Sequence, residues 1–264
     1  MIKPLITVAK SKSPISEAYR TLRTNIQFTG VDFETRKIMI TSAGPGEGKS
    51  STVANLAVSL AQAGKSVLII DADMRNPTQH KLFNLNNWEG LSRTLFQDRE
   101  LELAKYWQET EVPGLHVLTA GPIPPNPAEL LGSKRMRWLL DEAGREFDMV
   151  IIDTPPVIAV ADSSILAREI DGVILVLASG EVSRDYAARA KEQLEKVGAK
   201  ILGAVLNKVE MKTKEHYYYY YYHGEKRSKN KKKKRNTIRE NSDNYPTESW
   251  HSNPLSHAET AAGK

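Results

Sequence analysis

The sequence of 264 residues contains no cysteine, which excludes disulfide bonds and metal sites built from thiolates and fits a reducing compartment. It also has no run of about 18 consecutive apolar residues, the length that a membrane-spanning helix needs. The first residues lack the apolar stretch of a secretory signal. We therefore expect a cytoplasmic protein, and any attachment to a membrane would come through a partner or a surface contact.

Aromatic residues make up only 7% of the chain, yet six of its ten tyrosines are consecutive, at 217–222. Excess positive charge is also confined to one region. Residues 211–264 hold 12 Lys and Arg against 6 Asp and Glu, whereas residues 1–210 hold 25 against 26. The basicity belongs to the tail, so the core is expected to have no nucleic-acid partner.

From residue 37 to 207, short β-branched apolar runs alternate with longer segments of helical periodicity. This alternation predicts βα units and a parallel sheet. We expect strands at 38–41, 67–71, 116–119, 150–153, 173–177 and 201–206, and helices at 49–63, 128–146, 163–169 and 184–197. The predicted fold class is α/β, a doubly wound and mostly parallel sheet with helices on both faces.

Two segments flank this predicted domain of residues 31–210. Residues 1–30 contain one amphipathic helix from Ser16 to about Phe28, with Ser16 as candidate N-cap, and this leader could project from the domain. Beyond the last predicted strand the apolar periodicity stops. Residues 211–264, with a lysine-rich run at 229–235, are predicted to form a largely disordered tail.

A glycine-rich loop, Ala43-Gly-Pro-Gly-Glu-Gly-Lys-Ser-Ser51, joins the first predicted strand to the first core helix. Backbone N–H groups of such a P-loop converge on phosphate oxygens, Lys49 supplies a positive charge, and the Ser50 hydroxyl can ligate magnesium. Ala43 departs from the usual pattern, because it stands at the position of the first glycine. The strand–loop–helix context disfavours a plain glycine turn. The expected nucleotide-binding residues of the loop are Gly44, Gly46, Glu47, Gly48, Lys49, Ser50 and Ser51.

Two further predicted strands end in acidic residues. Asp71 and Asp73 follow one strand and Asp153 follows another. Ligands of an open parallel sheet bind at the carboxyl ends of the strands, so these acids should gather around the phosphates held by Lys49. A single Asp there is often only a helix cap or turn residue, but three beside a P-loop favour phosphoryl transfer, which needs carboxylates for a metal and for the attacking hydroxyl.

The motifs at residues 43–50, 68–75 and 150–155 resemble, in order and spacing, those of the bacterial protein-tyrosine kinases that regulate capsule and exopolysaccharide synthesis. The resemblance spans about residues 14–222. Related septum-site and plasmid-partition ATPases share the expected P-loop NTPase fold, but they carry a lysine five residues before the invariant one. Here that position is Gly44, so a switch-type ATPase remains the alternative.

The resemblance implies that the cofactors are ATP and Mg²⁺. Asp71 would be the base for the tyrosine hydroxyl, and Asn207 would lie near the adenine. The implied magnesium ligands are Ser50, Asp73 and Asp153. The implied catalytic set is Lys49, Asp71, Asp73 and Asp153.

The tyrosine run has no use in a core, and the resemblance implies that it holds the phosphate acceptors of an autophosphorylating kinase. These acceptors would be Tyr217, Tyr218, Tyr219, Tyr220, Tyr221 and Tyr222. Two alternatives stay open. The run could be an adhesive low-complexity segment, or the chain could be a non-enzymatic adaptor that another kinase phosphorylates.

Glu17, Arg20 and Arg23 share one face of the leader helix at three-residue spacing. Alone, this pattern describes a charged surface with an intrahelical ion pair. It also resembles the family's helix that joins subunits into a ring, which implies a homo-oligomer when unphosphorylated. The other implied partners are a membrane-anchored activator, which would recruit the chain to the inner face of the membrane, tyrosine-bearing protein substrates and a cognate phosphatase.

Overall fold

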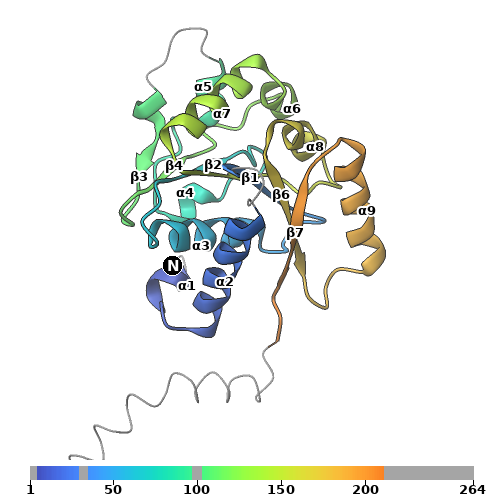
Figure 1. The fold of residues 1–264 in the computed structure, drawn as a ribbon. Helices are drawn as coiled ribbons and strands as arrows, with labels where there is room; N and C mark the ends of the chain where they lie inside the picture. Colours follow the sequence, from blue (N-terminus) through green and yellow to red (C-terminus); the bar gives the residue numbers. More distant parts are fainter. Residues whose placement is uncertain (1–4, 30–34, 97–102, 211–264) are drawn as a thin grey trace, which may run out of the picture. The chain divides into compact units, whose positions relative to one another are not determined.

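The computed structural model of the chain describes residues 5–29, 35–96 and 103–210 (Figure 1). These residues belong to one unit, which ends at Glu210. The predicted tail, with its tyrosine cluster and lysine-rich run, lies outside the described residues. Among the helices of the described ranges, none is both long and apolar enough to span a membrane.

A seven-stranded sheet forms the centre of this unit, in the spatial order β3-β4-β2-β5-β1-β6-β7. The strands are β1 (Lys37–Ser42), β2 (Val67–Asp71), β3 (Gln108–Glu109), β4 (Leu115–Leu118), β5 (Met149–Asp153), β6 (Gly172–Ala178) and β7 (Ile201–Asn207). Neighbouring strands are parallel except for β3 and β4. The predicted α/β fold with a doubly wound, mostly parallel sheet is thereby confirmed.

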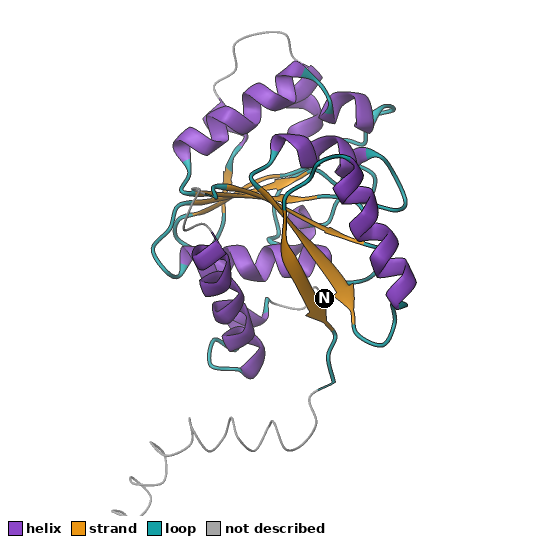
Figure 2. Ribbon diagram, turned by 45° about the vertical axis from the view of Figure 1, so that its right-hand side comes forward, coloured by secondary structure: helices purple, strands orange, loops and turns teal. Residues whose placement is uncertain are grey.

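Helices cover both faces of the sheet, α1 to α4 on one side and α5 to α9 on the other (Figures 1 and 2). They are α1 (Ile6–Ala9), α2 (Pro14–Thr29), α3 (Lys49–Ala61), α4 (Gln79–Leu82), α5 (Leu91–Phe96), α6 (Pro127–Leu131), α7 (Lys134–Glu146), α8 (Asp162–Leu166) and α9 (Arg184–Lys196). Two short 3₁₀ segments add to these, η1 (Leu103–Tyr106) and η2 (Ala167–Glu169).

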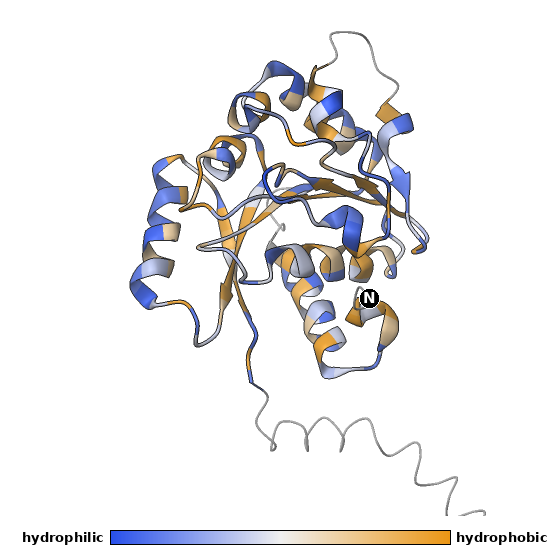
Figure 3. Cartoon of the chain, turned by 180° about the vertical axis from the view of Figure 1, so that it is seen from behind, coloured by the Kyte–Doolittle hydropathy of each residue, from blue (hydrophilic) through white to orange (hydrophobic). Residues whose placement is uncertain are grey.

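The alternation of side chains along each strand divides the interior into two cores. In β1, Ile38 and Ile40 pack in the core beneath α3, whereas Met39 packs in the core beneath α7. Because both faces are covered, the central strands are continuous apolar runs rather than alternating ones. Figure 3 shows hydrophobic residues concentrated in the strands, whereas most of α9 is hydrophilic.

One long predicted helix, at 128–146, is in fact two helices. α6 ends at Leu131, and Gly132 is its C-cap. Ser133 is the N-cap of α7, and its side chain accepts a hydrogen bond from the N–H of Met136, at 3.1 Å. A serine N-cap accepts the hydrogen bond of a backbone N–H that, in an uninterrupted helix, would bond to a carbonyl of the preceding turn. A new helix therefore begins at this serine. The two-residue strand β3 was not predicted, because a segment of that length has no alternating pattern.

The leader helix packs onto the core instead of projecting from it. Ile26 of α2 is buried in the core beneath α3, and Arg23 Nη1 donates to the Ser59 carbonyl at 2.8 Å. The predicted N-cap was wrong. The helix begins at Pro14, and the hydroxyl of Ser13 accepts from the N–H of Ser16 at 3.1 Å, so Pro14 occupies the first helical position, which suits proline.

Candidate functional site

The P-loop leaves the centre of the sheet, because β1 lies between β5 and β6. Two of its glycines adopt left-handed backbone angles, Gly46 with φ +77° and Gly48 with φ +90°. A Cβ atom added to Gly48 would lie 2.0 Å from Nδ2 of Asn207. Glycine is therefore required at position 48 by conformation and by space.

Glu47 braces the loop from inside. Its buried carboxylate accepts hydrogen bonds from the N–H of Gly44 and from the N–H of Ala178, the latter at 3.1 Å. The Asn207 amide donates to the Glu47 carbonyl oxygen at 2.8 Å. The Glu47 side chain thus links the loop to β6 by hydrogen bonds, and Asn207 contacts the loop from the end of β7.

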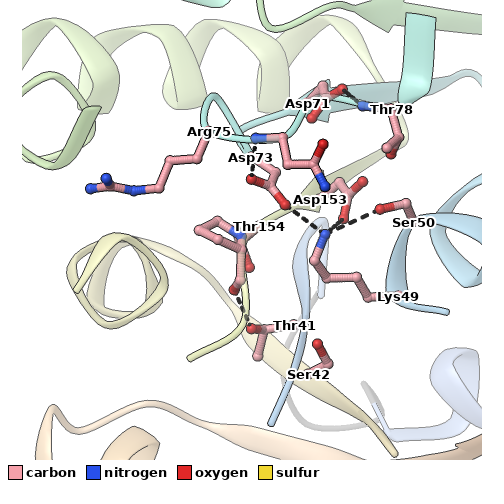
Figure 4. A network of polar contacts seen from close by, with 12 residues as sticks. Thr41, Ser42, Lys49, Ser50, Asp71, Asp73, Arg75, Thr78, Asp153 and Thr154 are labelled. Carbon is pink, nitrogen blue, oxygen red and sulfur yellow. Dashed lines mark hydrogen bonds and ion pairs between the residues drawn. The ribbon is translucent and has the colours of Figure 1, made fainter. Parts of the chain in front are cut away.

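The sheet's carboxyl edge brings two of the predicted acids, Asp73 and Asp153, to one ammonium group (Figure 4). Nζ of Lys49 lies 2.7 Å from Oδ2 of Asp73, 3.6 Å from Oδ1 of Asp153 and 3.2 Å from Oγ of Ser50. All three acids are buried, including Asp71. Adjacent parallel strands produce this cluster, because Asp71 and Asp153 are direct register partners of β2 and β5.

Asp71 is held by the chain that follows it. Its Oδ2 accepts the backbone N–H groups of Thr78 and Gln79, at 3.1 and 3.0 Å, while Oδ1 is buried without a hydrogen-bond partner. Burial raises the pKa of Asp71 well above its ordinary value, and the charge of Asp153 raises it further, against the two N–H bonds. The carboxylate is therefore a stronger base than an exposed one.

Lys49 provides the compensating charge. Burial lowers its pKa, but Asp153 and Asp73 outweigh burial, so the pKa of Lys49 is raised and the group stays protonated. Burial raises the pKa of Asp153, and Lys49 is the strongest opposing influence. The ammonium thus opposes the effect of burial on the Asp153 carboxylate, although the pKa of that group remains above its ordinary value.

Two further contacts of the site were not predicted from the sequence. Arg75 forms a two-pronged pair with the buried carboxylate of Asp162, at 2.9 and 3.0 Å, which ties the loop after β2 to α8. Gln79 donates its side-chain amide to Oδ2 of Asp153 at 2.7 Å. Neither Asp162 nor Gln79 stands in a recognisable motif, and each is paired with a residue far away in the chain, so no local signal could have found them.

The residues fit a nucleotide with Mg²⁺. Asp71 Oδ1 is a buried oxygen without a hydrogen-bond partner, and such an oxygen is costly unless a cation or a donor meets it. Asp153 Oδ1 also lacks a hydrogen bond, and the Lys49 ammonium is 3.6 Å from it. No three acidic or histidine side chains of the described residues cluster closely enough to hold a metal alone. That suits magnesium, which commonly binds one or two carboxylates together with substrate phosphates. Ser50, Asp73 and Asp153 would hold the ion, and Lys49 with the loop amides would hold the phosphates.

The predicted oligomerisation residues differ in their contacts. Glu17 and Arg20 form an ion pair within α2, and Arg20 also donates to the Ser11 carbonyl. Arg23 instead contacts Ser59 on α3. In the single chain, the face therefore contains one intrahelical pair and one residue that holds α2 to the P-loop helix. The predicted acceptors, Tyr217–Tyr222, lie outside the described residues.

Comparison with known proteins relates the whole core to one group. A family model described as ParA, NUBPL iron-transfer P-loop NTPase, matches residues 34–240. Iron–sulfur clusters are held mainly by cysteine thiolates, and this sequence has none, so the shared feature is the P-loop NTPase fold. The chain is 50% identical over 217 residues to tyrosine-protein kinase YwqD of Bacillus subtilis (strain 168), covering 82% of the chain and 91% of that relative.

Solved structures give the same picture. The kinase domain of Escherichia coli tyrosine kinase ETK is 38% identical, with a TM-score of 0.76, covering 80% of this chain and 82% of that one. The chimerical protein CapA2B2 is 45% identical, with a TM-score of 0.75, covering 78% and 90%. Both structures are therefore similar to this chain over more than three quarters of its length.

Proposed function

This chain belongs to the family of bacterial tyrosine-protein kinases, and on that basis we propose that it transfers the γ-phosphate of ATP to its own residues Tyr217–Tyr222 and to tyrosines of other proteins. The observation that carries the proposal is the contact of the Lys49 ammonium with the buried carboxylates of Asp73 and Asp153, next to the P-loop and to Asp71. We also propose a role in capsular or exopolysaccharide synthesis, which the motif resemblance supports.

The reaction needs a base and a held phosphate. The tyrosine oxygen bonds to the γ-phosphorus, the bond from that phosphorus to the β–γ bridging oxygen breaks, and ADP leaves. Asp71 accepts the phenolic proton, for which its free Oδ1 and raised pKa suit it. Mg²⁺, held by Ser50, Asp73 and Asp153, would supply charge neutralisation on the phosphates. Asn207 would lie near the adenine.

The decisive experiment incubates the pure chain with ATP labelled at the γ-phosphate and with Mg²⁺, then maps the label. Label on tyrosine supports the kinase. Free phosphate without protein label supports the switch-type ATPase, and neither product supports an adaptor. The absence of a lysine at position 44 and the tyrosine-kinase relatives both argue against the ATPase.

The tail is predicted to carry the label and to control assembly. Tyr217 lies ten residues beyond Asn207, a reach of at most about 35 Å, which allows entry into a neighbouring site. Six phosphotyrosines would add roughly −9 to −12 charge, which the acid cluster repels. A variant with all six tyrosines changed to phenylalanine should lose most of the label and keep its mass after ATP and Mg²⁺, whereas the wild type should dissociate, as measured by light scattering. If both keep the same mass, the cluster does not control assembly.

The leader helix is predicted to join subunits into a ring. Arg20→Ala together with Arg23→Ala should convert the oligomer to monomers in light scattering. Because Arg23 also donates to Ser59 within the chain, Arg23→Ala alone should lower the free energy of unfolding by about 1 kcal/mol, whereas Arg20→Ala should change it little. A demonstrated oligomer of unchanged mass in the double variant would contradict this role.

A membrane-anchored activator is the proposed main partner, and it would recruit the kinase to the inner face of the membrane. Support comes from the motif resemblance and from the solved relative CapA2B2, which is a chimerical protein. A cognate phosphatase would reverse the modification of the tyrosine cluster.

A further inference from the structure

One buried residue contacts all three motifs of the site, although the proposed reaction assigns it no role. Gln79, the first residue of α4, is fully buried. Its backbone N–H donates to Asp71, and its side-chain amide nitrogen donates to Oδ2 of Asp153 at 2.7 Å and to the carbonyl oxygen of Ser50 at 3.1 Å. The end of β2, the end of β5 and the P-loop therefore meet at this one residue.

These contacts are not those of a space-filling residue. Burying an amide costs free energy unless it is hydrogen-bonded, and a leucine would fill the same volume without that cost. Both hydrogens of the Gln79 amide have acceptors, whereas its Oε1 is buried without a partner. The site therefore contains a polar group with an unpaired oxygen. The amide nitrogen of the same group donates to an acid and to the P-loop.

The consequence falls on Asp153. Gln79 occupies Oδ2 of that carboxylate, so Oδ1 is the oxygen nearest to Nζ of Lys49, at 3.6 Å. The second bond fixes the backbone of Ser50, whose hydroxyl lies 3.2 Å from the same ammonium. The Gln79 amide thus contacts both the acid and the backbone of the serine.

We propose that Gln79 is a positioning residue for phosphoryl transfer, which orients the Asp153 carboxylate and holds it at a fixed separation from the Ser50 hydroxyl. This inference rests on the proposed function, because it concerns the same reaction. It assigns Gln79 no contact with the substrate. The residue acts through Asp153 and Ser50.

The test compares Gln79→Leu with the wild type in tyrosine phosphorylation at neutral pH over a series of Mg²⁺ concentrations. Without the Gln79 amide, Oδ2 of Asp153 and the carbonyl of Ser50 lose a donor, so the half-maximal rate should require more Mg²⁺. At low Mg²⁺ we expect kcat to fall about 10- to 100-fold, the range for a lost hydrogen bond to a charged group, with KM for ATP changed less than about threefold. The deficit should shrink at high Mg²⁺.

A second readout does not need catalysis. Calorimetry should show that Mg²⁺ strengthens ADP binding less in Gln79→Leu than in the wild type, while metal-free ADP binds equally. The matched control is Gln62→Leu, because the Gln62 amide donates to the Thr7 carbonyl, away from the site, and this variant should match the wild type in both assays. If Gln79→Leu fails to fold, Gln79→Met gives the same measurements with a side chain of similar length.

The inference is overturned if the folded Gln79 variants keep the wild-type kcat and Mg²⁺ dependence, or if their rate loss is equal at every Mg²⁺ concentration, since the latter is the result of a merely structural defect. A wild type that forms no phosphotyrosine would instead overturn the proposed function. In that case the Mg²⁺ dependence of ADP binding still decides the role of Gln79.

Discussion

Replacing Lys49 with methionine is expected to reduce phosphotyrosine formation at least about a hundredfold, and also to destabilise the fold at neutral pH. The ammonium lies between Asp73 and Asp153, and the Lys49 side chain is only 12% exposed. Removing one partner of a buried pair leaves uncompensated charge, which costs on the order of 3 kcal/mol. For a domain of this size the melting temperature should fall by roughly 6–12 °C in calorimetry.

The sign of the pH dependence of stability in Lys49→Met distinguishes an uncompensated buried charge from a general packing defect. Without Lys49, the pKa of Asp153 in the folded state rises further above its value in the unfolded chain. Its contribution to stability is then present at low pH and is lost as pH rises through the folded pKa, so acidification should recover part of the lost stability. Adding Asp153→Asn to Lys49→Met should restore the melting temperature but not the activity.

A matched control is available on α9. Lys191 forms an exposed pair with Glu195 at 2.5 Å, so Lys191→Met removes a lysine and a salt bridge outside the site. Such a pair contributes about 0.3–0.5 kcal/mol, so this variant should keep wild-type activity and nearly wild-type stability. A Lys49→Met variant as active as this control would contradict the role given to the P-loop lysine.

Asp71→Asn is expected to reduce kcat at least about a hundredfold without lowering the melting temperature at neutral pH. Asparagine keeps an oxygen for the N–H groups of Thr78 and Gln79, but it cannot accept the phenolic proton. It also removes a buried charge that lies beside Asp153. The control is Asp141→Asn, at an exposed carboxylate paired with Lys37, which should leave kcat unchanged.

Stability measured against pH tests the same residue without catalysis. The pKa of Asp71 is raised in the folded chain, so its favourable contribution is fully present below the unfolded pKa and is lost as pH rises through the folded one. The asparagine that replaces it does not titrate. The variant should therefore melt higher than the wild type at pH 8, with the difference shrinking on acidification. A difference in melting temperature that is constant with pH would show that the pKa of Asp71 is not raised in the folded chain.

Local patterns in the sequence were sufficient for most of the frame. The apolar run of β2 was predicted with its observed bounds, and the P-loop was identified between β1 and α3, because both depend on residues adjacent in the chain. Failures occurred where a local pattern was ambiguous or absent. The helix predicted at 128–146 is divided by the serine cap at Ser133, and the leader helix begins two residues before the predicted cap.

By itself, the sequence determined that three acids and a lysine lie at one edge of a parallel sheet. Strand ends and glycine loops can be recognised from residues that are contiguous in the chain. Only the tertiary structure decided how those groups are held. Gln79 meets Asp153 across 74 positions, Arg75 meets Asp162 across 87, and Glu47 meets Ala178 across 131. Such pairs depend on register and on the packing of loops over the sheet, and a single sequence has no short-range pattern that specifies them.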